Sequence, residues 1–208
     1  MKRVLYSIIG LMALTSCSAQ TETATGCSDR EVVEKVIMTR RSIRRYTDRT
    51  VSRDTLNDIL KCGINAPNGQ NRQAYEVRVV DSPKLLAEIS EAVRKDNPGV
   101  SSRNNAGNIF AGATCVVFIA NDTSYDVSQI DCGLLGENIM LAAWSRGIGS
   151  CCMAHPVRLM KESGSCVPYM ERLGFSKGYN LLYCIAMGYP GETPKAKPRK
   201  DGMIRFVE

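Results

Sequence analysis

The 208-residue sequence contains only one histidine, His155, and this scarcity excludes several kinds of catalytic site. Because the chain also lacks a Cys-x-x-Cys pair, a zinc site would need mostly isolated thiolates as ligands. A serine–histidine or cysteine–histidine pair for nucleophilic catalysis is not recognisable either. Neither a Walker loop nor a Gly-x-Gly-x-x-Gly motif is present. If the protein is an enzyme, a cofactor therefore supplies the reactivity, and the chain supplies binding, orientation and electrostatic field.

No apolar run is long enough for a membrane-spanning helix, which needs about 20 residues. The shorter run Val4–Leu14 follows two positive residues and leads into Leu14-Thr15-Ser16-Cys17, so residues 1–16 are predicted to be a signal peptide. Leu-Thr-Ser-Cys resembles a bacterial lipobox, in which Cys17 would be acylated; an ordinary cleaved signal is the alternative. Residues 17–27 would then be a polar tether. We expect an exported cell-envelope lipoprotein on the periplasmic side, attached to the membrane only through its lipid anchor.

The positive charge is modest, which argues against a nucleic-acid-binding protein. The formal net charge of +6 falls to +4 when Lys2 and Arg3 are removed with residues 1–16. No basic platform interleaved with aromatic side chains is recognisable. Residues 28–208 suffice for one domain with a sizeable core, and no internal repeat or second domain is evident. We expect a small anionic ligand and no nucleic acid.

Nine cysteines in an exported chain raise the question of disulfides. Cys62, Cys115 and Cys184 lie in apolar patterns, where a thiol behaves as a small hydrophobic group. The adjacent Cys151 and Cys152 are either a redox pair or buried strand residues beside a ligand. Disulfide connectivity does not follow from the sequence.

Apolar periodicity and capping signals predict alternating helices and strands. Helices are expected from the capping box at Ser28 to the exit at Arg40, from Ser52 to Ala66-Pro67, from Ser82-Pro83 through Val93, and over Ser128–Arg146. Strands are expected at Tyr75–Val79, Ala113–Ala120, Ile148–Met153 and Leu181–Gly188, with a short strand-like end at Met203–Val207. Residues 96–108 have loop composition and are predicted to be a substrate-side lid.

The helix predicted at Ser128–Arg146 carries a broad apolar stripe. Its members are Ile130, Leu134, Leu135, Asn138, Leu141 and Ala142, and Gly133 and Gly136 beside it would let a second helix approach closely. The stripe indicates either a dimer interface or burial in the core, and the pattern does not decide between them.

Two polar segments carry the functional signal. The arginine segment, Arg40–Tyr46, reads Arg-Arg-Ser-Ile-Arg-Arg-Tyr and gathers forked donors of the kind that bind phosphate or carboxylate. The amide turn, Ala66–Gln73, reads Ala-Pro-Asn-Gly-Gln-Asn-Arg-Gln, and its side-chain amides can donate to and accept from the edge of a heterocycle. Together they predict a phosphorylated heterocyclic ligand.

The two segments, in this order and separated by a short helix, resemble the FMN-dependent nitroreductase family. The resemblance runs from about Val36 to the C-terminus, with Asp131–Ala154 and Pro194–Lys200 as further matching stretches. It implies that residues 28–208 are an FMN-binding α+β domain with a central, mainly antiparallel sheet flanked by helices. It also implies a homodimer with FMN in a cleft between the subunits.

The resemblance assigns expected roles to individual residues. Arg44 would place a positive charge near the pyrimidine edge of the flavin, where it stabilises the anionic reduced form. The remaining expected contacts are Arg40, Arg41 and Ser42 for the phosphate and ribityl chain; Asn68, Gly69, Asn71 and Gln73 from the second subunit; Cys152, Met153 and Ala154 against the ring; and Lys197 and Arg199 closing on the phosphate.

The implied activity is oxidoreduction by a ping-pong mechanism. Hydride would pass from NAD(P)H, or another donor, through flavin N5 to a nitroaromatic or quinone-like acceptor, with no side chain required as an acid or base. One alternative is a flavin- or anion-binding lipoprotein without turnover. A second is a redox-active disulfide protein built on Cys151 and Cys152. Reduction of bound FMN by nicotinamide would separate the enzyme from the binding protein.

Overall fold

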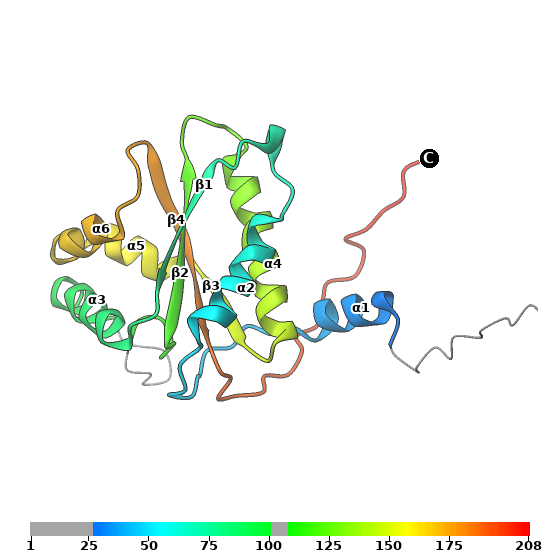
Figure 1. Ribbon diagram of the computed structural model, residues 1–208, viewed down its shortest axis with the longest axis horizontal. Helices are drawn as coiled ribbons and strands as arrows, with labels where there is room; N and C mark the ends of the chain where they lie inside the picture. The colour runs from blue at the N-terminus through cyan, green and yellow to red at the C-terminus, as the bar shows by residue number, and fades with distance from the viewer. Residues whose placement is uncertain (1–26, 101–107) are drawn as a thin grey trace, which may run out of the picture.

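The computed structural model describes residues 27–100 and 108–208 (Figure 1). Its sheet contains four antiparallel strands in the order β1-β2-β4-β3. The strands are β1 (Tyr75–Val80), β2 (Cys115–Asp122), β3 (Gly149–Met153) and β4 (Tyr179–Gly188). The predicted signal peptide, the acylation site Cys17 and most of the predicted lid lie outside the described residues. The expected α+β fold with a mainly antiparallel sheet is confirmed.

Helices cover both faces of the sheet (Figure 1). On one face lie α3 (Pro83–Asp96), α5 (His155–Glu162) and α6 (Val167–Leu173), and on the other lie α2 (Arg53–Ile64) and α4 (Ser128–Ser145). Strand β2 is buried on both faces, with Phe118 packed toward α3 and α5 and Ile119 toward α2 and α4. Fully burying one such side chain stabilises the fold by about 1.5–3 kcal/mol.

Helix starts follow the predicted capping signals. Ser28 begins α1 (Asp29–Thr39) with the expected capping box to Glu31, and Ser52 and Ser82 cap α2 and α3. Each cap satisfies backbone N–H groups that have no partner inside the helix.

Only part of the apolar stripe expected on α4 belongs to its buried face. Leu135 is fully buried, but Ile130 and Leu134 are 64% and 41% exposed, and Ile139, outside the expected stripe, is buried against α2. Apolar residues occur all around α4, so helical period alone could not identify the face that packs. Gly136 approaches Tyr183 of the sheet rather than a second helix.

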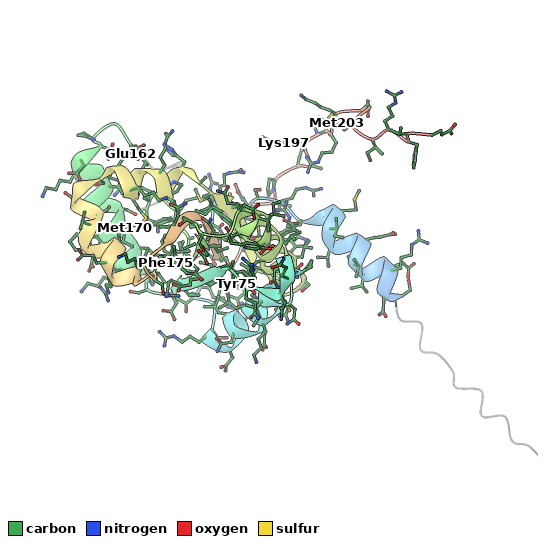
Figure 2. All side chains as sticks on the ribbon, turned by 90° about the horizontal axis from the view of Figure 1, so that it is seen from above. Tyr75, Glu162, Met170, Phe175, Lys197 and Met203 are labelled. Carbon is green, nitrogen blue, oxygen red and sulfur yellow. The ribbon has the colours of Figure 1, made fainter. Side chains whose placement is uncertain are left out.

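Two predictions about chain segments need correction. Met203–Val207 pairs with no strand, and its apolar side chains are exposed. The tail leaves the body of the protein, as the positions of Lys197 and Met203 show in Figure 2. The strand expected at Ala113–Ala120 begins two residues later, at Cys115. Helices α5 and α6 were not predicted.

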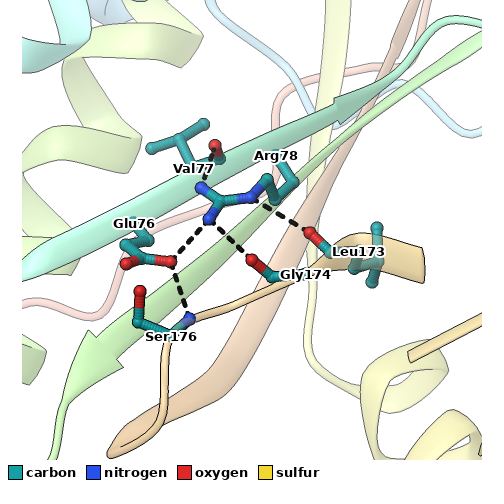
Figure 3. A network of polar contacts seen from close by, with 6 residues as sticks. All are labelled: Glu76, Val77, Arg78, Leu173, Gly174 and Ser176. Carbon is teal, nitrogen blue, oxygen red and sulfur yellow. Dashed lines mark hydrogen bonds and ion pairs between the residues drawn. The ribbon is translucent and has the colours of Figure 1, made fainter. Parts of the chain in front are cut away.

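Arg78 of β1 fixes the connection between α6 and β4 (Figure 3). Its guanidinium donates to the carbonyls of Leu173 and Gly174 at 3.0 and 2.9 Å, which satisfies groups left open at the end of α6. It also pairs with Glu76 at 2.7 Å, and the same carboxylate oxygen accepts from Ser176 N at 3.1 Å. This network sets where β4 begins.

Candidate functional site

The arginine segment lies against the start of β3. Ile43 is fully buried, and its N–H donates to Ser150 O at 2.9 Å. It packs so closely on Gly149 that a Cβ there would lie 2.7 Å from Ile43 Cγ1. Because Ile43 anchors the segment from inside, its neighbours Ser42 and Arg44 remain partly exposed beside the strand.

The three predicted arginines lie close together but have different partners. Arg40 Nε lies 3.6 Å from Glu137 Oε1 on α4. Arg41 donates to two carbonyls at the end of α1, each at 2.8 Å, and Arg44 donates to Ser42 O at 3.3 Å. A guanidinium that pairs weakly at the surface can exchange its partner for a bound anion.

Two side chains that the sequence did not single out hold the segment in place. Glu192 Oε1 accepts from the backbone N–H of Arg44 at 2.5 Å. The Tyr46 hydroxyl donates to Ile43 O at 2.7 Å, with Ala186 O of β4 at 3.1 Å. Burial, reinforced by nearby Cys151, raises the pKa of Tyr46, so its hydroxyl keeps the donated proton at neutral pH.

A cavity of about 560 Å³ opens between the arginine segment and α5. Its lining includes Arg44, the β3 end from Cys151 to Ala154, and His155. The apolar side chains of Ile109 and Leu159 also line it. This size is within the usual range for small-ligand sites, and the mixture suits a flat aromatic ligand with polar edges.

The adjacent cysteines occupy different environments. Cys151 is buried, whereas Cys152 points to the opposite face of the strand and is exposed at the rim of the cavity. Burial and the neighbouring Cys151 raise the pKa of the Cys152 thiol, and Arg40 opposes this shift. No disulfide joins the two cysteines. The arrangement therefore favours strand residues beside a ligand over a redox pair.

The amide turn has an unusual backbone. Gln70, Asn71 and Gln73 all have positive φ, at 54°, 53° and 51°. Each left-handed residue other than glycine costs roughly 1–2 kcal/mol. The Asn68 side chain compensates in part by accepting from Gln73 N at 2.9 Å, and the turn leaves Gln70, Asn71 and Gln73 exposed. Strain of this kind persists where surrounding contacts impose it.

Within the chain the arginine segment and the amide turn do not meet. The turn contacts the start of α4, where Gly69 N donates to Asp131 Oδ1 at 3.0 Å. The residue before the arginine segment, Thr39, contacts the far end of α4, where it accepts from Trp144 Nε1 at 2.9 Å. These two points on α4 are about 20 Å apart along its axis.

The predicted tail contacts are not among the residues that line the cavity either. Lys197 and Arg199 are exposed on the C-terminal tail, which extends from the body of the subunit (Figure 2). The structure thus brings Arg44 and Cys152–Ala154 together in the lining of one cavity. Arg40, Arg41 and Ser42 precede Arg44 in the chain and are not among the lining residues, and the amide turn and the tail cations lie elsewhere. Sequence reasoning missed Glu137, Glu192 and Asp131 as partners; the one available signal was Glu192, an isolated acid before a basic tail.

Over residues 27–100 and 108–208, no group of three or more histidine, cysteine or acidic side chains could hold a metal ion. In the same part of the chain, no helix is long and apolar enough to cross a membrane.

The protein has an antiparallel sheet covered by helices, with a cationic segment and a cavity at one strand end. These features are those of α+β proteins that bind small ligands. The Nitroreductase family model matches residues 37–189, and the chain belongs to this family. The crystal structure of a nitroreductase with bound FMN from Desulfitobacterium hafniense has a TM-score of 0.76 and 29% identity, covering 85% of this chain and 98% of that one. The structure of a Bacteroides fragilis nitroreductase with bound FMN has a TM-score of 0.74 and 28% identity, again covering 85% of this chain and 98% of that one. The NADPH-flavin oxidoreductase of Vibrio harveyi is 25% identical over 181 residues, 79% of this chain and 68% of that protein.

Proposed function

We propose that the protein is an FMN-dependent oxidoreductase that uses NAD(P)H, or another donor, to reduce nitroaromatic or quinone-like acceptors. The observation that carries the proposal is the cavity, which is lined by both Arg44 and the end of β3. Family membership and the FMN-bound neighbours support it. Bound FMN would supply hydride transfer between donor and acceptor.

The residues present fit this cofactor. Arg40, Arg41 and Ser42 offer cationic and hydroxyl groups for the phosphate and ribityl chain, and the pairing of Arg40 with Glu137 is loose enough to yield to an anion. Arg44 would add positive charge at the pyrimidine edge, and Cys152, Met153 and Ala154 would lie against the ring. Ile109 and Leu159 would limit the access of water.

The protein would act as a homodimer, because one subunit holds only part of the predicted site. The amide turn would contact the flavin bound by the second copy through Asn68, Gly69, Asn71 and Gln73. The tail would wrap around the partner and bring Lys197 and Arg199 to the same flavin. Exposed apolar residues support this: Val33 and Met38 on α1 are 56% and 73% exposed, and Phe206 on the tail is 91% exposed. Apolar side chains gathered on extended arms are typical of surfaces that another chain covers.

The first test is the visible spectrum of the soluble form beginning at Ser18, reconstituted with FMN and then treated with NADH or NADPH without oxygen. We expect flavin bands that bleach on adding nicotinamide. Bands that persist under both nicotinamides would favour another electron donor. They would instead favour the binding protein without turnover if a chemical reductant bleaches them and no acceptor then reoxidises the bound flavin faster than it reoxidises free FMN. A chain that retains no FMN would contradict the proposal.

We further propose that the protein is a lipoprotein anchored through Cys17 on the periplasmic side of the cell envelope. The lipobox-like Leu14-Thr15-Ser16-Cys17 supports this. In an expressing bacterium, the full chain should fractionate with membranes and incorporate labelled palmitate, and Cys17→Ser should abolish both. Equal labelling of the Cys17→Ser variant would refute the anchor.

A further inference from the structure

Asp131 is a buried carboxylate that holds the amide turn from a distant part of the chain. It lies in the first turn of α4 and is 3% exposed. Its Oδ1 accepts from the N–H of Gly69 at 3.0 Å across 62 residues of sequence, and its Oδ2 has no hydrogen-bond partner among the described residues. A buried charge with a single donor is costly even at a helix N-terminus, so the bond to Gly69 is the specific contact that Asp131 makes.

The rest of the turn depends on this point of attachment. Gly69 sits against the Tyr125 side chain, and a Cβ at Gly69 would overlap the Tyr125 hydroxyl. The Arg72 guanidinium lies 4.4 Å from the centre of the same ring. One edge of the turn is therefore fastened to the start of α4.

The opposite edge of the turn is exposed and has unused hydrogen-bonding groups. The side-chain amides of Gln70, Asn71 and Gln73 make no hydrogen bond within the part of the chain that the structure describes, although all three residues are left-handed. A strained loop that is fastened on one edge and presents free amides on the other is suited to receive a ligand.

We propose that Asp131 is a positioning residue that acts on the flavin of the second copy. Through Gly69 it keeps the amide turn in the conformation that presents Asn71 and Gln73 to that flavin. The inference rests on the proposed function, because it requires both FMN binding and a dimer. It adds a residue from α4 that sets the affinity of a site in the other subunit.

Two substitutions of nearly the same size distinguish the effect of the hydrogen bond from the effect of side-chain volume. Asp131→Leu removes the acceptor, and Asp131→Asn keeps one. We expect Asp131→Leu to weaken FMN binding roughly tenfold, the usual effect of losing a hydrogen bond to a charged group, and Asp131→Asn to stay within about threefold of the wild type. FMN affinity is measured by quenching of flavin fluorescence on titration into the apoprotein.

A matched control shows whether any lost polar contact of α4 has the same effect. Asn138 lies two turns along α4 and donates to Cys62 O of α2 at 3.2 Å, away from the amide turn. Asn138→Leu should lower the melting temperature of the apoprotein and leave FMN affinity unchanged. If Asn138→Leu weakens FMN binding as much as Asp131→Leu, the effect is one of general stability and the inference fails.

Mixed dimers test whether Asp131 acts across the interface. In a heterodimer of one Asp131→Leu subunit and one Arg40→Ala subunit, purified through two different tags, one site combines the intact arginine segment of the first with the intact turn of the second. We expect one FMN per heterodimer with wild-type affinity. If neither site shows wild-type affinity, Asp131 acts within its own subunit and the inference is overturned.

Failure of the proposed function has a different signature. Wild-type protein that binds no FMN would refute the proposed function itself. Wild-type protein that binds FMN while Asp131→Leu binds it equally well would refute only the role of Asp131. Should Asp131→Leu fail to fold, Asp131→Ala, which removes the same acceptor without adding bulk, takes its place in the titration and in the mixed dimer; failure of that dimer to retain one intact site would equally overturn the inference.

Discussion

At the scale of single residues, Arg44 is held by its backbone rather than by its guanidinium. Glu192 binds its N–H, and Tyr46 binds the carbonyl of the preceding Ile43. Among the described residues, the guanidinium itself makes one hydrogen bond, of 3.3 Å, and it lines the cavity. The chain therefore fixes where the charge is attached and leaves the charge available to a ligand.

Arg44→Ala should reduce the rate of flavin reduction more than it reduces FMN affinity. Loss of a charge that stabilises the reduced flavin is expected to slow reduction by roughly 10²-fold, as for other electrostatic groups of this kind. The dissociation constant for FMN should change by less than about tenfold, because Arg40, Arg41 and Ser42 remain. Anaerobic stopped-flow bleaching by NADH and fluorescence titration give the two values.

Arg45→Ala is the matched control for that experiment. Arg45 is adjacent and exposed, and its backbone carbonyl accepts a hydrogen bond from Gly191 N at 2.8 Å. It should leave both values near those of the wild type. Equal losses of rate and affinity in Arg44→Ala would count against the assigned role.

At the scale of elements, helices position the site by packing on the sheet and on each other. Helices α2 and α4 meet where Gly63 faces Ile139, and a Cβ at Gly63 would lie 2.5 Å from Ile139 Cγ1. Helix α3 is tied to the connection between α5 and α6 by Asp96, which accepts from Ser163 and Ser165 at 2.5 to 2.9 Å.

Gly63→Ala should destabilise the subunit by about 1–3 kcal/mol, because the added methyl overpacks the contact between α2 and α4. The free energy of unfolding is measured by urea denaturation of the apoprotein. Asn57→Ala, on the exposed side of α2, should change it by less than about 0.5 kcal/mol. A Gly63→Ala variant as stable as the wild type would mean that α2 can shift away from α4.

The Asp96 contacts predict a dependence of stability on acid. Hydrogen bonds from Ser163, and then from Ser165, lower the pKa of Asp96 below its ordinary value of 3.8. The unfolded state therefore binds this proton more readily, so the contribution is present above about pH 4 and is lost as pH falls through the lower, folded pKa.

Asp96→Asn should accordingly reduce the loss of melting temperature between about pH 4 and pH 2. Circular dichroism across that range measures it. Asp126→Asn, at an exposed position of the β2–α4 connection, should keep the wild-type profile. Parallel profiles for wild type and Asp96→Asn would show that this carboxylate does not contribute.

At the scale of the whole molecule, the subunit has two arms that extend from its body. Helix α1 has no buried residue, and the tail beyond Gly202 is fully exposed although it ends in apolar Met203–Val207 (Figure 1). In the homodimer that we propose, a second copy of the chain would cover these arms and bring an amide turn to each arginine segment.

The soluble form beginning at Ser18 should therefore have twice the mass of one chain in light scattering. Deleting residues 203–208 removes only exposed side chains, so the subunit should stay folded. The dissociation constant of the dimer should increase, and FMN occupancy should fall as the dimer dissociates. Deleting Glu208 alone should change neither. A wild-type monomer that binds FMN fully would contradict the composite site.

Features that depend on near neighbours in the chain were determined by the sequence alone. The caps at Ser28, Ser52 and Ser82 act over three residues, and strand alternation acts over two, so the starts of three helices and the four strands could be predicted. The positions of the cationic segment and the β3 end followed from motif order. Because these signals are local, they do not need the fold to be known.

Features that depend on long-range packing were decided by the tertiary structure. Which side of α4 is buried depends on where α2 and the sheet lie, and the apolar end Met203–Val207 is exposed and unpaired with any described strand. The partners of the site, Glu192 with Arg44 and Asp131 with Gly69, are 148 and 62 residues apart. Such contacts form only when folding brings distant segments together, and neither composition nor periodicity encodes their geometry.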